Sequence, residues 1–211
     1  MLKYTIKNIA DISDEEYKKS YSLMNPQRRE KIQRLKGEAS QKRTLAGEWL
    51  SRRLLSHVTG QNPGFFSISP DEYGKPQLEN FSDIFFNISH SKNTIVAAVC
   101  DEKIGVDIEE IRPVSPKLAK KICTAEELLY IFGKAPTCAD FDDNLNPLFL
   151  KRFFEIWTIK EAYFKYIGTG ITEFQTVSTL SDSFSKIKIE NDNFIVHMVT
   201  SAKAVAEFVR V

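Results

Sequence analysis

The sequence is poor in cysteine, contains no long apolar run and carries almost no net charge. Its three cysteines, Cys100, Cys123 and Cys138, are far apart and form no CxxC pair, so we expect unpaired thiols in a reducing compartment. No segment approaches the roughly 18 apolar residues of a membrane span, and the N-terminus has no apolar signal core. We therefore expect a cytoplasmic protein with no membrane partner.

Positive and negative side chains nearly cancel. Lys plus Arg number 29 against 28 for Asp plus Glu, so the chain lacks the basic field typical of nucleic-acid-binding proteins. We expect no nucleic-acid partner, although a small phosphate-binding patch is compatible with this balance. A length of 211 residues, with 42% hydrophobic and 27% charged residues, is typical of a soluble protein with one or two compact domains.

A long amphipathic helix followed by strands occurs twice along the chain. An apolar stripe predicts the first helix over Ser40–Val58, and a similar stripe predicts the second over Leu148–Ile167. Helices and strands come in runs rather than in strict alternation, which favours an α+β fold. The best boundary lies near residue 102, which gives an N-terminal half of residues 1–102 and a C-terminal half of residues 103–211. The other predicted elements are a helix starting at Ser13, a helix over Pro116–Phe132, and strands over Leu2–Ile9, Phe65–Ser69, Phe85–His90, Thr94–Cys100, Ile104–Ile108, Val177–Leu180, Lys186–Ile189, Phe194–Val199 and Ala204–Val211.

The first candidate site is the acidic strand Gly105–Glu110. Alternate side chains of a strand share a face, so Asp107 and Glu109 point the same way while Val106 and Ile108 face the core. Two neighbouring carboxylates repel each other, and Mg²⁺ removes that cost by taking one or two carboxylates together with substrate phosphates. A solvated acidic strand end is the alternative interpretation.

The second candidate site lies on the second long helix. Helical spacing puts Trp157, Glu161 and Lys165 on one face. The alternative is a core tryptophan beside an ordinary Glu–Lys pair. That alternative does not account for the same residues occurring together with the acidic strand.

The third candidate is the segment Asn87–Ser91, in which His90 stands between Ser89 and Ser91 at the end of a strand. Backbone N–H groups become free at such an end, so the segment is able to grip a phosphate. A structural or merely exposed histidine is the alternative.

Basic side chains of the first half form the fourth candidate. A solvated helix face is the alternative for most of them. Lys75 differs because Gly74 and Pro76 fix the backbone around it. The group consists of Arg28, Lys31, Lys42, Arg43 and Lys75, with Thr44 beside Arg43.

Together, these segments resemble the two-halved 4'-phosphopantetheinyl transferases that serve peptide and polyketide synthetases, the type of the surfactin-synthetase-activating enzyme. The matching motifs are G-K-P at 74–76, F-N-I-S-H-S at 86–91, G-V-D-I-E at 105–109 and W-T-I-K-E-A-Y-F-K at 157–165. Four motifs in the right order are far more specific than any one of them. The resemblance covers roughly residues 26–171, and the remaining C-terminal residues agree only in their strand-like pattern.

This resemblance implies a fold and an activity. The fold is a monomer of two similar α+β subdomains related by pseudo-twofold symmetry, each a small antiparallel sheet packed on a long helix. Coenzyme A is expected in the cleft between the halves. The activity is transfer of the 4'-phosphopantetheine arm of coenzyme A to a serine of an apo peptidyl or acyl carrier protein, with release of adenosine 3',5'-bisphosphate. The implied cofactor is Mg²⁺, with Mn²⁺ as an alternative.

The resemblance also implies roles for individual residues. Asp107, Glu109 and Glu161 correspond to the carboxylates around the metal. Glu161, directly or through a metal-bound water, is the candidate for taking the serine proton, and Lys165 for stabilising charge on the departing phosphate. His90 is expected to reach the 3'-phosphate, whereas Lys160 points somewhat away on an ideal helix. The implied coenzyme A contacts are Arg28, Lys31, Arg43, Thr44, Lys75, Ser89, His90 and Lys160.

Two further assignments follow from the resemblance less directly. Glu127 corresponds to the acid of an F-[ST]-x-x-E stretch, but Cys123 replaces the aromatic residue and Glu126 is a rival. The irregular segment 113–147 is the expected carrier-protein surface, because loops near an active site often recognise the partner. Its apolar candidates, for which core packing is the alternative, are Leu118, Ile122, Leu128 and Leu129.

Two other classes of function remain open from the sequence. A different Mg²⁺-dependent phosphoryl enzyme, such as a nucleotide pyrophosphatase, uses the same three carboxylates but gives Asn87–Ser91 no role. A non-catalytic binding protein that keeps the fold as a partner platform predicts no metal-dependent binding of coenzyme A.

Overall fold

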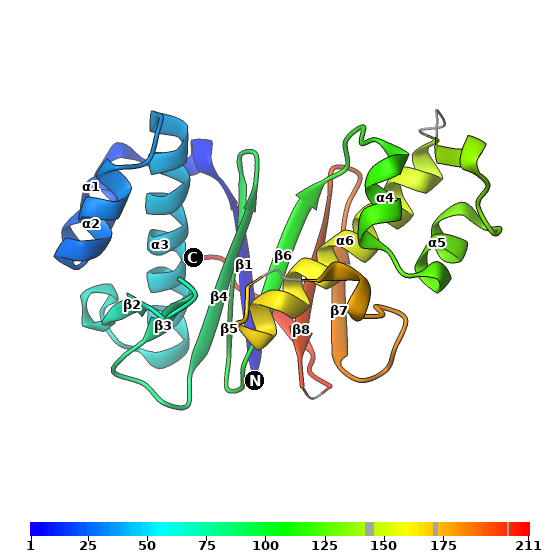
Figure 1. Cartoon of the computed structure of the whole chain (residues 1–211). Coiled ribbons are helices and arrows are strands. Elements are labelled where there is room, and N and C mark those ends of the chain that lie inside the picture. Colours follow the sequence, from blue (N-terminus) through cyan, green and yellow to red (C-terminus); the bar gives the residue numbers. More distant parts are fainter. Residues whose placement is uncertain (142–145, 171–172, 202) are drawn as a thin grey trace.

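The computed structural model describes residues 1–141, 146–170, 173–201 and 203–211. It is an α+β fold in which two sheets meet in the middle and helices cover their outer faces (Figure 1). The N-terminal sheet has the strand order β4-β5-β1-β9, and the C-terminal sheet has the order β6-β8-β7. A separate hairpin pairs β2 with β3. The strands are β1 Leu2–Asn8, β2 Ile68–Pro70, β3 Pro76–Leu78, β4 Phe85–Ser91, β5 Thr94–Cys100, β6 Gly105–Glu110, β7 Ser185–Glu190, β8 Phe194–Thr200 and β9 Ala206–Phe208.

Apolar side chains of the two sheets share one core. Val96 and Ala98 of β5 lie in the same cluster as Val106 and Ile108 of β6 and Met198 of β8. Neighbouring strands are antiparallel in both sheets, except that β9 runs parallel to β1. The last strand of the chain therefore returns to the N-terminal sheet.

Helix α3 (Glu38–Thr59) covers the outer face of the N-terminal sheet. Its buried stripe includes Trp49 and Leu54, which belong to one core cluster with Ile95 and Val99 of β5. Helices α1 (Asp14–Leu23) and α2 (Pro26–Gln33) lie beside α3 (Figure 1).

Helix α6 (Pro147–Ile167) covers the outer face of the C-terminal sheet. Phe153 and Ile156 of this helix share a core cluster with Ile195 of β8. Its N-cap is Asn146, whose side chain accepts from the N–H of Phe149. Helices α4 (Pro116–Ile122) and α5 (Ala125–Phe132) pack at the far end of α6 (Figure 1). Among the described residues, no helix is both long and apolar enough to cross a membrane.

Two predicted elements are wrong. The single helix expected over Pro116–Phe132 is two helices, because Cys123 and Thr124 are extended. Thr124 starts α5 with a capping box to Glu127, a pattern already legible in T-A-E-E. The strand expected over Val177–Leu180 does not form, because the N–H and hydroxyl of Thr179 both donate to the buried carboxylate of Glu127 instead of to a strand partner.

Candidate active site

The two sheets are joined along their edges by side chains of β4. The amide oxygen of Asn87 accepts from the N–H of Val106 at 2.9 Å, although β4 and β6 belong to different sheets. Ser89 and Ser91, each two residues further on, donate to carboxylates of β6. Side chains two residues apart share a face of a strand, so this edge of β4 faces the acidic strand along its length.

Asp107 is the centre of the acidic group and is 5% exposed. Its Oδ1 accepts from the Ser89 hydroxyl at 2.7 Å and from Lys165 Nζ at 2.6 Å. Its Oδ2 is buried and has no hydrogen-bond partner. A buried carboxylate oxygen without a partner is costly, so this atom is available to a ligand that brings positive charge.

Glu109 and Glu161 face Asp107 from β6 and α6. Burial and the charges of Asp107 and Glu109 outweigh the opposing charge of Lys165 and raise the pKa of Glu161 to about 7. Burial is also the main cause that raises the pKa of Glu109, and the charge of Asp107 adds to it. The charge of Asp107 therefore opposes the ionisation of both Glu109 and Glu161, as expected for carboxylates grouped without a cation.

Gly105 lets α6 come close enough to bring Glu161 and Lys165 to β6. A Cβ at this position would lie 1.9 Å from the carbonyl oxygen of Ala162 and 2.4 Å from the backbone nitrogen of Tyr166. Backbone atoms cannot move aside as a flexible side chain can. Glycine is therefore required here by the contact between strand and helix.

A pocket of about 320 Å³ opens beside this group, between the β2–β3 turn, β4 and the end of α6. Lys75, Glu161 and Lys165 are among the residues that line it, and Tyr73 and Phe164 supply apolar surface. The ammonium of Lys75 donates to the backbone carbonyls of Ile104 and Lys165, at 3.2 and 2.5 Å. Burial lowers the pKa of Lys75 to about 8. Lys75 thus links the N-terminal hairpin to the C-terminal half at the pocket.

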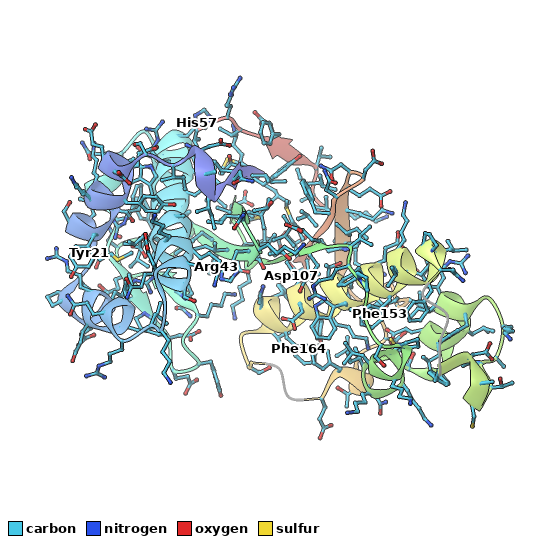
Figure 2. All side chains as sticks on the ribbon, turned by 90° about the horizontal axis from the view of Figure 1, so that it is seen from above. Tyr21, Arg43, His57, Asp107, Phe153 and Phe164 are labelled. Atoms are coloured by element: carbon cyan, nitrogen blue, oxygen red, sulfur yellow. The ribbon has the colours of Figure 1, made fainter. Side chains whose placement is uncertain are left out.

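Arg43 and His90 belong to the positive side of the site. Figure 2 shows Arg43 of α3 on the inner side of the N-terminal half, towards Asp107 of β6. Partial desolvation and the charges of Arg43 and Lys165 lower the pKa of His90. A guanidinium NH₂ of Arg43 donates to Ser40 at 3.0 Å, and the Thr44 hydroxyl donates to the Ser40 carbonyl.

Two of the basic residues have different surroundings. Arg28 forms a 2.6 Å ion pair with Glu48, which is 1% exposed and also pairs with the buried Arg52. Lys31 is exposed on α2. The structure does not bring either side chain to the carboxylates.

Lys160 is not placed as the resemblance implies. Its side chain is 0% exposed and its ammonium lies 2.9 Å from the carboxylate of the equally buried Glu127. The same nitrogen donates to the carbonyls of Phe174 and Val177, both at 2.6 Å. Because its ammonium is enclosed by these partners, we expect a structural role for Lys160, and its contact with coenzyme A stays a prediction. The carboxylate of Glu127 also caps α5 and accepts from Thr179, and the choice between Glu126 and Glu127 stays open.

The expected carrier surface is only partly exposed. Ile122 is buried in the core, and Leu118 and Leu128 pack against the same cluster. Leu129 is 51% exposed, and Tyr130 beside it is also exposed. Residues 142–145 of the predicted segment 113–147 lie outside the described residues.

The donor set has the chemistry of a hard-cation site. Within the described ranges, no three His, Cys, Asp or Glu side chains are grouped so that they hold an ion as they stand. However, Asp107 Oδ2 is unpartnered, and Glu109 and Glu161 have raised pKa values. Carboxylate oxygens are the ligands that Mg²⁺ prefers, so the residues present fit such an ion.

An acidic group and basic side chains thus lie beside a pocket at the junction of two sheets, an arrangement that suits an α+β protein binding a metal ion together with a phosphate. Comparison with known sequences identifies the family. A model described as the 4'-phosphopantetheinyl transferase superfamily matches residues 103–207, and a model described as the N-terminal part of 4'-phosphopantetheinyl transferase matches residues 11–102. The chain belongs to the 4'-phosphopantetheinyl transferase superfamily.

Several curated relatives carry that activity in their names. The chain is 31% identical to the 4'-phosphopantetheinyl transferase Sfp of Bacillus subtilis over 86% of its own length and 73% of that protein. It is 36% identical to the 4'-phosphopantetheinyl transferase gsp of Aneurinibacillus migulanus over 61% of its length and 49% of that protein. It is 33% identical to the 4'-phosphopantetheinyl transferase HetI of Nostoc over 64% of its length and 56% of that protein. The relatives thus support a transferase of the Sfp type.

Proposed function

We propose that this protein transfers the 4'-phosphopantetheine arm of coenzyme A to a serine of an apo peptidyl or acyl carrier protein, releasing adenosine 3',5'-bisphosphate. The observation that carries the proposal is the meeting of Asp107, Glu109 and Glu161 with Lys165 beside the pocket between the two halves. We further propose that residues 1–102 and 103–211 are related by pseudo-twofold symmetry. A long helix on the outer face of each sheet supports this relation.

We propose that Asp107, Glu109 and Glu161 hold a Mg²⁺ ion, with Mn²⁺ as an alternative. Asp107 Oδ2 is the atom best suited to it, because it is buried and unpartnered. When bound, the ion would neutralise charge on the diphosphate of coenzyme A and orient it for in-line attack.

Glu161 is the proposed general base. Its carboxylate lines the pocket between the halves, where a carrier serine would have to enter to reach the substrate phosphorus. Glu161 takes the proton of the carrier serine as the serine oxygen bonds to the β-phosphorus of coenzyme A. The bond from that phosphorus to the bridging oxygen breaks, and Lys165 stabilises the negative charge on the leaving adenosine bisphosphate.

The residues proposed to hold coenzyme A are Lys75, Ser89, His90, Arg43 and Thr44. Lys75 and Lys165 line the pocket, and the partly desolvated His90 lies in the positive field of Arg43, which suits a phosphate. Arg28 and Lys31 stay proposed contacts at the adenosine and phosphate end. For Arg28, part of the guanidinium would have to serve the substrate while the other part remains paired with Glu48.

The carrier protein is proposed to dock on the α4–α5 side of the C-terminal half. Leu129 and Tyr130 on α5, and Leu148 at the start of α6, expose apolar surface there. We also propose a monomeric, cytoplasmic enzyme. Both sides of the site come from one chain, and the three unpaired cysteines suit a reducing compartment.

The test of this site is the Asp107→Asn variant. The amide keeps the shape of the carboxylate and still accepts from Ser89, but it brings no negative charge to a metal. We expect the variant to fold, to lose transfer to a carrier almost completely, and to lose Mg²⁺-dependent binding of coenzyme A in calorimetry. Near-normal transfer by Asp107→Asn would refute the metal assignment. Release of adenosine bisphosphate without any carrier would instead favour a pyrophosphatase.

A further inference from the structure

Ser91, the last residue of β4, makes two hydrogen bonds to successive residues of β6. Its hydroxyl donates to Glu109 Oε2 at 2.8 Å and accepts from the N–H of Glu110 at 3.1 Å. Its side chain is enclosed, since the residue is 7% exposed. A hydroxyl held at both its donor and acceptor positions has a fixed orientation.

Glu109 is partly buried, so its carboxylate has less water to bind than an exposed carboxylate and depends more on a hydrogen-bond donor from the protein. Among the described residues, its Oε2 accepts from Ser91 at 2.8 Å and from the guanidinium of Arg112 at a long 3.5 Å. Trp157 on α6 is also close enough to this carboxylate to oppose the rise in its pKa. Ser91 therefore holds one oxygen of Glu109 from the N-terminal half, while the rest of the carboxylate faces α6.

The role of Ser91 differs from that of Ser89. Ser89 contacts both Asp107 and Lys165, so its removal would disturb the acidic and basic sides of the site together. Among the described residues, the carboxylate that Ser91 contacts is that of Glu109. Its effect on Glu109 can therefore be measured without disturbing Asp107 or Lys165.

We propose that Ser91 is a positioning residue, which fixes the carboxylate of Glu109 across the junction of the halves so that its other oxygen is presented to a divalent cation. This inference rests on the proposed metal site. Groups that orient a metal ligand through a hydrogen bond typically contribute about 10- to 100-fold to metal affinity. Ser91 is expected to act in this way although it does not itself touch metal or substrate.

The probe for the experiment is Tb³⁺, whose luminescence is sensitised by a nearby indole. Trp157 lies near enough to Glu109 to influence its pKa, so Tb³⁺ at the carboxylates would report its own binding, and Trp157→Phe should abolish the signal. We expect Ser91→Ala to raise the dissociation constant for Tb³⁺ about tenfold or more. Ser91→Thr keeps the hydroxyl and should bind close to normally. The matched control is Ser20→Ala, which removes another buried hydroxyl bond, to the Leu45 carbonyl on the far side of the N-terminal half.

A double-mutant cycle separates positioning from a general effect on the fold. In the Glu109→Gln background, Ser91→Ala should cause little further loss of Tb³⁺ affinity, since the carboxylate that it orients is gone. The same tenfold loss in both backgrounds, or no loss in either, would overturn the inference while leaving the metal site standing. Absence of Tb³⁺ binding by the unaltered protein would overturn the inference and the metal site together.

Discussion

Replacing Lys160 by methionine tests whether this residue is structural. The substitution keeps most of the apolar volume but leaves the carboxylate of Glu127, which is 0% exposed, without its counter-ion. It also leaves the carbonyls of Phe174 and Val177 without their donor. Removing one partner of a buried ion pair costs about 3–5 kcal/mol. For a protein of this size that is a fall in Tm of about 6–20 °C.

The assay is urea and thermal unfolding of Lys160→Met beside two comparison variants. Lys151→Met removes a lysine of the same helix from an exposed pair with Glu190 and should cost less than about 1 kcal/mol. Adding Glu127→Gln to Lys160→Met should recover part of the stability, because the uncompensated charge disappears. A Lys160→Met protein that unfolds like the unaltered chain but binds coenzyme A weakly would refute the structural role and favour a phosphate contact.

Two further predictions concern the close approach of β6 and α6. Gly105→Ala should destabilise the protein by about 3 kcal/mol or more, because the added Cβ would meet the Ala162 carbonyl at 1.9 Å. Gly47→Ala, whose nearest contact is a side chain at 3.3 Å, should cost less in the same unfolding assay, and equal losses would contradict this reasoning. For Glu161, the folded-state pKa of about 7 lies above its ordinary value of 4.5, so the folded state binds more protons between these values and loses stability as pH rises through them. Metal-free Glu161→Gln should therefore gain on the unaltered protein by at most about 3 kcal/mol between pH 4.5 and 8, and a pH-independent difference would contradict the raised pKa.

Local patterns predicted the long elements correctly. The 3.6-residue apolar repeat identified α3 and α6 to within two residues at each end, and β5 was predicted with its observed bounds. These elements form mainly because one face of each is apolar, and the spacing of apolar residues in the sequence shows that face directly. Alternation along β6 likewise placed Asp107 and Glu109 on one face.

Contacts between distant segments could not be predicted in this way. Ser91 and Glu109 belong to edge strands of different sheets, and their meeting depends on how the two sheets pack. The burial of Lys160 against Glu127 depends on where α5 lies relative to α6, which helical spacing along α6 alone does not give. The capping box before Glu127 was a usable local signal, and it would also have divided the helix predicted over Pro116–Phe132.

Intact mass spectrometry of an apo carrier protein incubated with this protein, coenzyme A and Mg²⁺ is the direct test of the proposed transfer. We expect the carrier to gain the mass of one phosphopantetheine, EDTA to prevent the gain, and a carrier that lacks its acceptor serine to show none. A panel of peptidyl, polyketide and fatty-acid carriers would then define specificity. No gain on any carrier, together with no Mg²⁺-dependent binding of coenzyme A, would contradict the proposed transferase activity.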